Sequence, residues 1–249
     1  MADATNSAVI PLRQERAAGR YPAGCAACTN RRPGWFCSLG SDVLAGLDLA
    51  AGSISLPAQA PLFAEGEDAR CLYLICNGYI KLTAGRPEGR RMIVRVAGPG
   101  SILGLYAVLS HGVYEVSAQA LTHTQLRPVE RNRFHSFLRA HKEAQVRAVQ
   151  CVCQEYRFAL QGACRISLAE TVAGRLARLL LELSHQIGED VNGSYRFPLL
   201  LTHEEIASMA CTTRETVTRT LGQFRKDGWI AIEDSIITVR QPELLHAVM

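Results

Sequence analysis

The spacing of hydrophobic residues changes near residue 131. Before it, over residues 38–130, glycine-rich turns separate short apolar runs, and after it the runs are longer and have a helical period. CLYLICNGYIKLTA, residues 71–84, predicts a strand, a turn and a second strand with Ile80 and Leu82 on one face. Short strands at such close spacing predict a β-sandwich or barrel in this part of the chain.

The run RRMIVRVAG has the period of a further strand. It predicts Met92, Val94 and Val96 on one face, with Arg91 and Arg95 on the other. Additional turns and strands are expected at 85–89, 98–104 and 115–129.

Between two predicted helices, 131–142 and 170–189, apolar residues recur at steps of three and four over nearly three heptads. They are Val146, Val149, Cys153, Tyr156, Leu160 and Ala163. This spacing forms an a/d seam along one side of a helix. The seam has two interpretations: it packs against its own domain, or it pairs with a second copy of the chain. We expect the second, a homodimer.

The C-terminal segment 201–239 has the pattern of a helix-turn-helix followed by a β-hairpin. Thr202 and Glu205 have the spacing of a capping box at the start of a short helix. The triplet CTT ends that helix, and Thr213 caps a second helix over 214–226. After a turn at DG, the runs WIAIE and SIITV predict the hairpin of a wing. The second helix is expected to bury Val217, Leu221 and Phe224.

The outward face of that second helix carries residue types that read DNA bases. In a helix-turn-helix, the N-terminal half of the recognition helix meets base edges in the major groove. Arginine binds guanine O6 and N7 with two hydrogen bonds, and glutamate accepts one from cytosine N4. Four basic residues against one acidic residue give 212–226 a charge of +3. The predicted DNA-binding residues are Thr213, Arg214, Glu215, Thr218, Arg219 and Lys226, with Lys226 at a phosphate.

Overall charge and composition add less. The chain carries a net +4, but from residue 165 onward nine Arg and Lys stand against 11 Asp and Glu, so only the local pattern predicts DNA. No apolar run approaches the roughly 20 residues that span a bilayer, and no basic start followed by an apolar block predicts a secretory signal. We therefore expect a cytoplasmic protein without membrane contact, whose nine cysteines form no disulfide framework.

The motifs LTHEEIA and TRETVTRTLGQFRKDG resemble the winged helix-turn-helix of the CRP/FNR family of bacterial transcription regulators. The resemblance extends over about residues 38–245 and implies an α+β fold. Its parts are an N-terminal β-roll like the cyclic-nucleotide-binding jelly roll, a long dimerisation helix and a C-terminal winged helix-turn-helix. The expected divisions are a leader with a cysteine cluster (1–38), the β-roll sensor domain (39–141), the dimerisation helix (142–168) and the DNA-binding domain (169–249).

The same resemblance implies a homodimer that binds a palindrome in double-stranded DNA and acts on RNA polymerase, and not an enzyme. RETVTR is similar to the CRP branch, which implies Arg214 and Arg219 on guanines and Glu215 opposite a cytosine, in a half-site like TGTGA. The family usually has glycine in the turn where Cys211 stands. A β-carbon strains a left-handed turn, so the helix angle is expected to differ slightly.

The β-roll lacks the residues that hold a cyclic nucleotide in the cyclic-AMP branch. That branch uses a Gly-Glu pair for the ribose and an Arg-Ser pair for the phosphate. The corresponding positions here are Gly104-Leu105 and Val116-Ser117. Burying an unpaired phosphate beside valine is costly, so cAMP binding is not expected. The roll binds another ligand or only transmits a signal.

Three cysteines in CAACTNRRPGWFC, namely Cys25, Cys28 and Cys37, lie just ahead of the roll. A CxxC pair allows two thiolates to reach one metal ion or one cluster edge. Arg31 and Arg32 follow closely and are expected to lower the thiol pKa values. These cysteines are the predicted cofactor and metal ligands.

In the FNR branch, three cysteines in this region and one from the roll hold an oxygen-labile 4Fe–4S cluster. The resemblance implies the same for these three. Trp35 and Phe36, next to Cys37, are expected to shield such a cluster from water. The C-x2-C-x8-C spacing is looser than in FNR, and Arg127 stands where the fourth cysteine is expected. Zinc, a reversible disulfide and cysteines without a cofactor remain open alternatives. The fourth ligand is undetermined: the candidates are Cys71, Cys76, Cys151, Cys153, Cys164, a histidine or a carboxylate.

The resulting prediction is a regulator controlled by oxygen, nitric oxide or redox state through an iron–sulfur cluster. One alternative is the same regulator gated by an unknown small ligand or by thiol oxidation, without metal. A remote alternative is a thiol oxidoreductase that uses Cys25 and Cys28. A redox motif of that class is expected between a strand and a helix, whereas this one precedes a β-roll.

Overall fold

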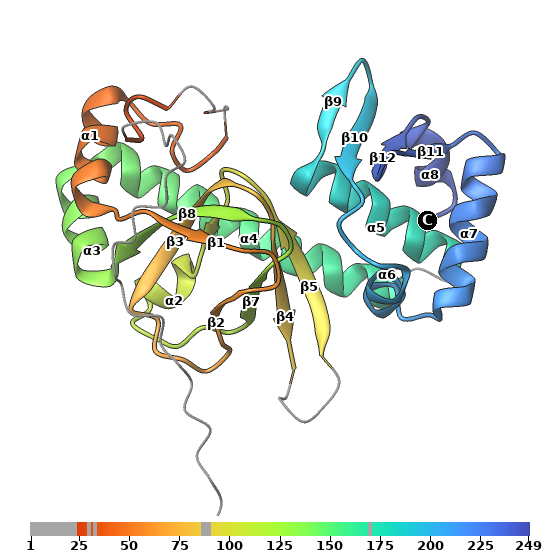
Figure 1. Ribbon diagram of the computed structural model, residues 1–249, viewed down its shortest axis with the longest axis horizontal. Helices are drawn as coiled ribbons and strands as arrows, with labels where there is room; N and C mark the ends of the chain where they lie inside the picture. The colour runs from red at the N-terminus through yellow and green to blue at the C-terminus, as the bar shows by residue number, and fades with distance from the viewer. Residues whose placement is uncertain (1–23, 29–30, 32–33, 86–90, 169–170) are drawn as a thin grey trace, which may run out of the picture.

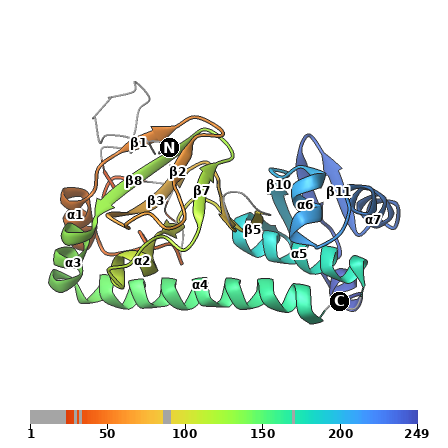
Figure 2. The ribbon, with the colours of Figure 1, turned by 90° about the horizontal axis from the view of Figure 1, so that it is seen from below.

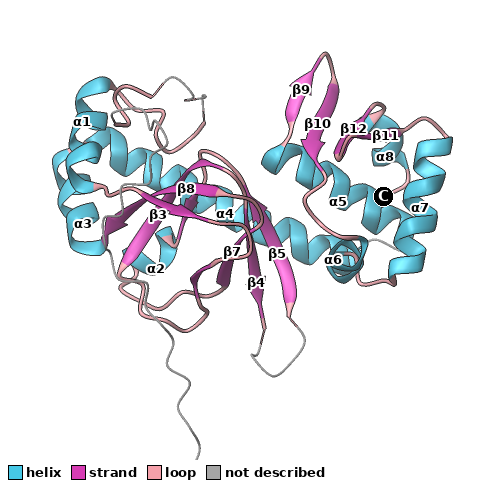
Figure 3. Ribbon diagram, in the orientation of Figure 1, coloured by secondary structure: helices cyan, strands magenta, loops and turns pink. Residues whose placement is uncertain are grey.

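The computed structural model describes residues 24–28, 31, 34–85, 91–168 and 171–249. Most of the predicted leader and of the predicted loop at 85–89 lie outside them. In the described part of the chain, no helix combines the length and apolar character that crossing a membrane requires. Two lobes are joined by one long helix (Figures 1 and 3).

The first lobe is a β-roll of two four-stranded antiparallel sheets, ordered β1-β8-β3-β6 and β2-β7-β4-β5. Leu72, Leu74, Ile80 and Leu82 are buried between the sheets, as alternation along each strand requires. The strands are β1 Ile54–Leu56, β2 Pro61–Phe63, β3 Cys71–Asn77, β4 Ile80–Ala84, β5 Met92–Ala97, β6 Ile102–Leu103, β7 Ser117–Ala120 and β8 Thr124–Glu130. The helices of this lobe are α1 Ser41–Ala50, α2 Leu105–Leu109 and α3 Arg131–Ala140.

Strand β5 does not have the predicted faces. Its pairing with β4 shifts register at a bulge, which interrupts the alternation of side chains. Met92 is exposed, whereas Ile93 and Val96 are buried in the core of the second lobe. Arg95 turns toward the long helix, where its Nη1 lies 3.4 Å from Glu155 Oε1. The outer surface of this strand therefore joins the two lobes.

Helix α4, Lys142–Leu168, runs beneath the roll and reaches the second lobe (Figure 2). The side that faces the roll buries Ala144, Ala148 and Cys151. The predicted seam lies on another side of the helix and is exposed, at 59% for Val146, 62% for Val149, 68% for Tyr156 and 50% for Leu160. The interpretation in which the seam packs against its own domain is therefore wrong.

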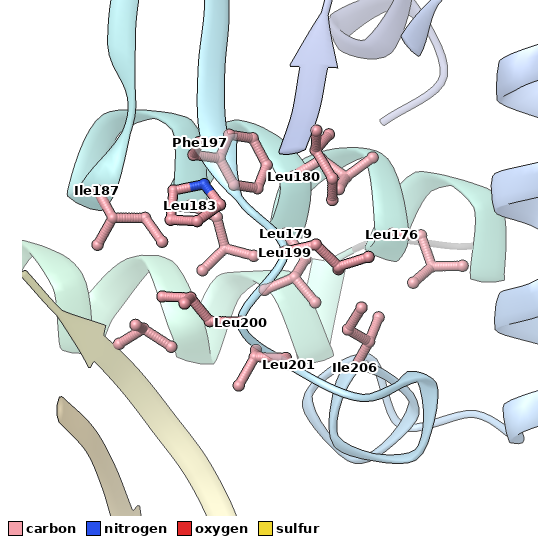
Figure 4. A pocket seen from close by; sticks show the side chains of 13 residues that line it. Leu176, Leu179, Leu180, Leu183, Ile187, Phe197, Leu199, Leu200, Leu201 and Ile206 are labelled. Carbon is pink, nitrogen blue, oxygen red and sulfur yellow. The ribbon is translucent and has the colours of Figure 1, made fainter. Parts of the chain in front are cut away.

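The second lobe is a winged helix-turn-helix, which confirms the predicted fold class. The predicted wing hairpin extends into a four-stranded sheet, β11-β12-β10-β9. Leucines of α5 pack against the segment that leads into α6 (Figure 4). The elements are α5 Val172–Ile187, β9 Glu189–Val191, β10 Ser194–Pro198, α6 His203–Met209, α7 Arg214–Lys226, β11 Ile230–Glu233, β12 Ile236–Val239 and α8 Pro242–Ala247.

Candidate functional site

The two helices of the helix-turn-helix begin at side-chain caps. The backbone N–H of Thr202 donates to Glu205 Oε2 (2.9 Å), and Thr202 Oγ1 accepts from the Glu205 N–H (3.2 Å). This pair is the predicted capping box. Thr213 Oγ1 accepts from the Thr216 N–H at 3.3 Å and starts α7. Both helix starts are thus fixed by local sequence.

The turn between α6 and α7 contains a strained residue. Cys211 has a φ of 49°, in the left-handed region that disfavours a β-carbon. Arg175 donates from Nε to the Ala210 carbonyl (2.8 Å) and from Nη2 to the Cys211 carbonyl (3.4 Å). Arg165 donates from Nε to the Met209 carbonyl (3.3 Å). Because the last carbonyls of a helix have no partner within it, these guanidinium groups stabilise the turn.

Arg165 joins three elements of the molecule. It lies near the end of α4, contacts α6 through its Nε, and forms a buried ion pair with Glu182 of α5. Burial lowers the pKa of Arg165 to about 10, which leaves it charged at neutral pH. Helix α4 is therefore connected to α5 by a buried charge pair and to the helix-turn-helix by a hydrogen bond.

Helix α7 buries Val217, Leu221 and Phe224 and turns another side toward solvent at the edge of the molecule (Figure 1). Hydrogen bonds from its own backbone N–H and from the Thr213 hydroxyl hold the pKa of Glu215 below its usual value. The carboxylate is therefore available as an acceptor at neutral pH. All six residues predicted to contact DNA are exposed: Thr213, Arg214, Glu215, Thr218, Arg219 and Lys226.

Two residues outside the predicted set contact this motif. His203 Nδ1 lies 2.8 Å from Thr218 Oγ1, and that hydroxyl also donates to the Arg214 carbonyl (3.0 Å). Lys81 of β4 donates from Nζ to Glu205 Oε1 (2.8 Å). Sequence reasoning misses both, because nothing in the motif LTHEEIA marks His203 as a partner of Thr218, and Lys81 is 124 residues away from its partner.

Two of the positions that would meet a cyclic nucleotide, Leu105 and Val116, carry apolar side chains that pack in the roll. Leu105 is completely buried, and Val116 packs against the core of the roll. Gly104 has a φ of 72°, and a β-carbon there would lie 2.7 Å from the Tyr114 ring. An aromatic side chain thus closes the space beside this glycine.

The three predicted cysteines lie against the β-roll. Cys25 is buried and its N–H donates to Asp48 Oδ1 (2.5 Å), while the Cys28 N–H donates to the Cys25 carbonyl (3.3 Å). Cys37 packs against the core of the roll. Asp48 also pairs with Arg127 Nη2 (2.9 Å), the residue that stands at the expected place of a fourth ligand.

A fourth thiol, Cys76 of β3, lies beside the first three. Burial raises the pKa of Cys76, Arg127 lowers it, and the neighbouring Cys28 raises it again. Cys76 likewise contributes to the raised pKa values of Cys25 and Cys37. Cys76 thus interacts electrostatically with each of the other three thiols. Among the residues that the structure describes, no three His, Cys, Asp or Glu side chains converge as a single metal ion requires.

The thiol pKa values differ from the sequence-based expectation. Burial raises the pKa of Cys25 to about 12 and that of Cys37 to about 11. Arg31 lowers the pKa of Cys37, but burial outweighs it, so the predicted lowering is wrong for these thiols. Arg32 lies outside the described residues. Phe36, expected to shield a cluster, is completely buried in the core of the roll.

Two family models match the chain: a cyclic nucleotide-binding domain over residues 53–141 and a Crp-like helix-turn-helix domain over 174–248. The CRP-like cAMP-activated global transcriptional regulator of Mycobacterium tuberculosis is 27% identical over 214 residues, 86% of this chain and 95% of that protein. Transcriptional regulator LdrP of Thermus thermophilus is 30% identical over 173 residues, 68% of this chain and 83% of LdrP. The structure of FixK2 from Bradyrhizobium japonicum superimposes with a TM-score of 0.69 at 24% identity, covering 80% of this chain and 96% of FixK2.

Proposed function

The chain belongs to the CRP/FNR family of DNA-binding transcription regulators, and from this premise we propose that it reads a palindrome with TGTGA-like half-sites as a homodimer. The observation that carries this proposal is the exposed N-terminal half of α7. There Arg214 and Arg219 are free to bind guanines, and Glu215 is charged and able to accept from a cytosine. Thr213 and Lys226 lie at the two ends of the helix and would contact phosphates.

The exposed seam on α4 supports the homodimer. Four large apolar side chains at heptad spacing stand in solvent in a single copy of the chain. A parallel second copy related by a two-fold axis would cover all of them at once. Such a dimer presents two α7 helices, one to each half-site of a palindrome.

The proposed division of labour follows the four segments. Residues 1–38 and 39–141 receive the signal, 142–168 dimerise and 169–249 bind DNA. A DNA-binding regulator of bacterial type works in the cytoplasm, and contact with RNA polymerase is proposed on the family resemblance alone.

For the signal, we propose an iron–sulfur cluster that responds to oxygen, nitric oxide or redox state, held by Cys25, Cys28 and Cys37. The donor set fits, because thiolates are the usual ligands of such clusters. A cluster of several irons also keeps its thiolates farther apart than a single ion does, which suits thiols that are neighbours but do not converge on one point. When bound, the cluster would supply a redox-active centre that is sensitive to oxygen.

The cysteine segment is connected to α4 by hydrogen bonds. The N–H of Gly40, three residues after Cys37, donates to the Glu143 carboxylate at 3.2 and 3.3 Å. Arg147 Nη2 donates to the Ser38 carbonyl at 3.5 Å. Glu143 and Arg147 flank the start of the dimer seam, so a shift of this segment would reach the dimer interface directly.

A small-ligand signal is the second candidate. A cleft of about 880 Å³ separates the roll from the β9–β10 hairpin and carries polar groups from both lobes, including Asn77 and Arg196. Its size suits a small molecule. Thiol oxidation without metal is less well supported, because reactive thiols have lowered pKa values and the pKa values of Cys25 and Cys37 are raised. The raised pKa of Cys25 also weighs against the thiol oxidoreductase.

Protein purified without oxygen tests the proposal in three separate measurements. Light scattering should give a dimer, iron assay should give iron, and fluorescence anisotropy should give binding to a TGTGA palindrome that weakens after exposure to air. Dimeric, iron-free protein that binds the palindrome equally well before and after exposure to air would refute the cluster. The proposed DNA-binding function would still stand. Absence of palindrome binding under every condition would refute the proposed half-site.

A further inference from the structure

Cys76 occupies a special position in β3. The pairing of β3 with β8 shifts between Ile75, which lies opposite Leu126, and Asn77, which lies opposite Gln125. Cys76 is the residue between them and has no partner on β8. A bulge of this kind turns a side chain away from its regular direction and is common beside functional sites. The backbone therefore directs the Cys76 thiol independently of the alternation that buries Leu74.

The surroundings of Cys76 come from the cysteine segment. It shares a cleft with Arg31 and Trp35, which lie between Cys28 and Cys37 in the sequence. Arg31 donates from Nε to the Cys28 carbonyl (3.1 Å), which places Cys28 next to a residue of that cleft. The nearby Cys28 and Asp48 raise the pKa of Cys76, and the Asp48 carboxylate accepts the Cys25 N–H.

The other candidates lie elsewhere. Cys71 stands at the opposite end of β3, where its charged neighbours are Glu130 and Arg131. Cys151 is buried on the side of α4 that faces the roll, beside Glu155. The last two cysteine candidates, Cys153 and Cys164, lie farther along α4.

Arg127 leaves a buried donor unused next to these thiols. Its Nη2 pairs with Asp48, but its Nε is buried and has no hydrogen-bond partner among the described residues. An unpaired buried N–H is costly unless an acceptor arrives. Arg127 lowers the pKa values of both Cys25 and Cys76, so a negatively charged group held by these thiols would be an acceptor within its reach.

We propose that Cys76 supplies the fourth thiolate of the iron–sulfur site, together with Cys25, Cys28 and Cys37, and that Arg127 donates a hydrogen bond to a sulfur of the same site. This inference rests on the cluster of the proposed function. The resemblance places the fourth ligand on β8, at the position that Arg127 occupies. The proposed ligand lies instead on the neighbouring strand β3, so Arg127 can remain beside the site. Arg127 is a positioning residue that offsets the negative charge of the site.

The first test compares Cys76→Ala with Cys71→Ala, a matched change in the same strand. Wild type reconstituted without oxygen should hold about four irons per chain. Removing a residue that only hydrogen-bonds to a metal ligand lowers metal affinity roughly 10–100-fold. Removing a ligand itself should cost at least as much, so Cys76→Ala should lose its iron at a chelator concentration at least about tenfold lower than wild type does. Cys71→Ala should retain its iron and visible spectrum. Equal iron, spectrum and chelator resistance in the two variants would overturn the assignment.

Wild-type protein provides a second test that does not depend on a variant. Iodoacetamide labelling followed by mass spectrometry should find Cys76 protected in the iron-loaded protein and labelled together with Cys28 once a chelator removes the iron. The same Cys76 labelling rate in both forms would overturn the assignment even if Cys76→Ala fails to fold. Wild-type protein that takes up no iron would instead refute the cluster itself. Binding of the palindrome, measured on the same sample, tests the DNA-binding function separately.

Arg127→Gln tests the positioning role. The variant should keep its iron but show a lower reduction potential, because a nearby cation favours the more negative reduced state. An unchanged potential would remove Arg127 from the site and leave Cys76 in it.

Discussion

Replacing Lys81 with methionine would remove the charge that joins the β-roll to the helix-turn-helix. Its Nζ lies 2.8 Å from Glu205 Oε1, and the two side chains are only 16% and 24% exposed. Methionine keeps an unbranched apolar side chain at this position. Glu205 would still accept the Thr202 N–H through Oε2, so the capping box of α6 would remain. The change therefore isolates the contact between the lobes.

The burial of this pair sets the expected magnitude. Exposed ion pairs contribute about 0.2–1 kcal/mol, and breaking a fully buried pair costs about 3–5 kcal/mol. A pair that is partly shielded on both sides lies between these limits, so Lys81→Met should lower the free energy of unfolding by about 1–3 kcal/mol at pH 7. Lys142→Met, which removes a charge from an exposed lysine, is the matched control.

The effect should depend on pH in a defined direction. Burial raises the pKa of Glu205, but hydrogen bonds from Lys81 and Thr202 outweigh it, so the pKa in the folded protein lies below its ordinary value. A depressed carboxyl pKa contributes stability that is present above the unfolded value of about 4.3 and is lost as pH falls through the folded value. The cost of Lys81→Met should therefore shrink below about pH 4.

Denaturant unfolding of wild type, Lys81→Met, Glu205→Gln and the double variant gives the coupling energy between the two side chains. A coupling below about 0.3 kcal/mol at pH 7 would show that this contact contributes nothing beyond the two separate side chains. A cost that is the same at pH 3 and pH 7 would refute the ionic explanation.

Three further predictions concern the DNA contacts of α7, the proposed dimer and the turn at Cys211. Arg219→Ala should cost about 1–3 kcal/mol per half-site and relax selectivity at one base pair, whereas Lys226→Ala should weaken binding to all sequences and reduce its salt dependence; identical behaviour in anisotropy titrations would contradict the base contact. Mild oxidation should cross-link the exposed Cys153 to its copy across the two-fold axis and leave Cys153→Ser uncrosslinked on non-reducing gels; a wild-type chain that stays monomeric would count against the seam. Cys211→Gly should raise the free energy of unfolding by about 0.5–1 kcal/mol, because glycine relieves the positive φ; calorimetry showing a loss of stability would mean that the turn is not strained.

Local periodicity predicts the elements that have one-sided burial. The stripe of Val217, Leu221 and Phe224 is enough to identify α7 and its exposed face from the sequence alone. Hairpin β9–β10 is not predicted from the sequence, because Glu189–Val191 is exposed throughout and shows no alternation. Strand β5 has a clear alternation but is misread, because Val94 bulges out of the pairing with β4 and nothing in the local sequence marks it as an unpaired residue.

Contacts between distant segments are the part that the sequence leaves open. CxxC spacing predicts that Cys25 and Cys28 act together, but nothing local distinguishes Cys76 from Cys71 five residues earlier in the same strand. The difference comes from Arg31 and Trp35, which lie at the same cleft as Cys76 of the β3 bulge. The contact between Lys81 and Glu205 is likewise not predictable from the local sequence. Each residue is charged and would be expected at the surface, and 124 residues separate them.

The cysteine segment is connected to α4 by contacts weak enough to break if the segment responds to a signal as proposed. The hydrogen bonds that Gly40 donates to Glu143 and that Arg147 donates to Ser38 are exposed or only partly buried, and each contributes about 0.5–1.5 kcal/mol. Allosteric coupling typically amounts to about 1–3 kcal/mol, so loss of two such bonds in each copy of a dimer is sufficient. The buried pair of Arg165 with Glu182 would persist through such a change, because breaking it costs more than the signal supplies. The C-terminal end of α4 and the helix-turn-helix would therefore move together as a rigid unit when the seam changes.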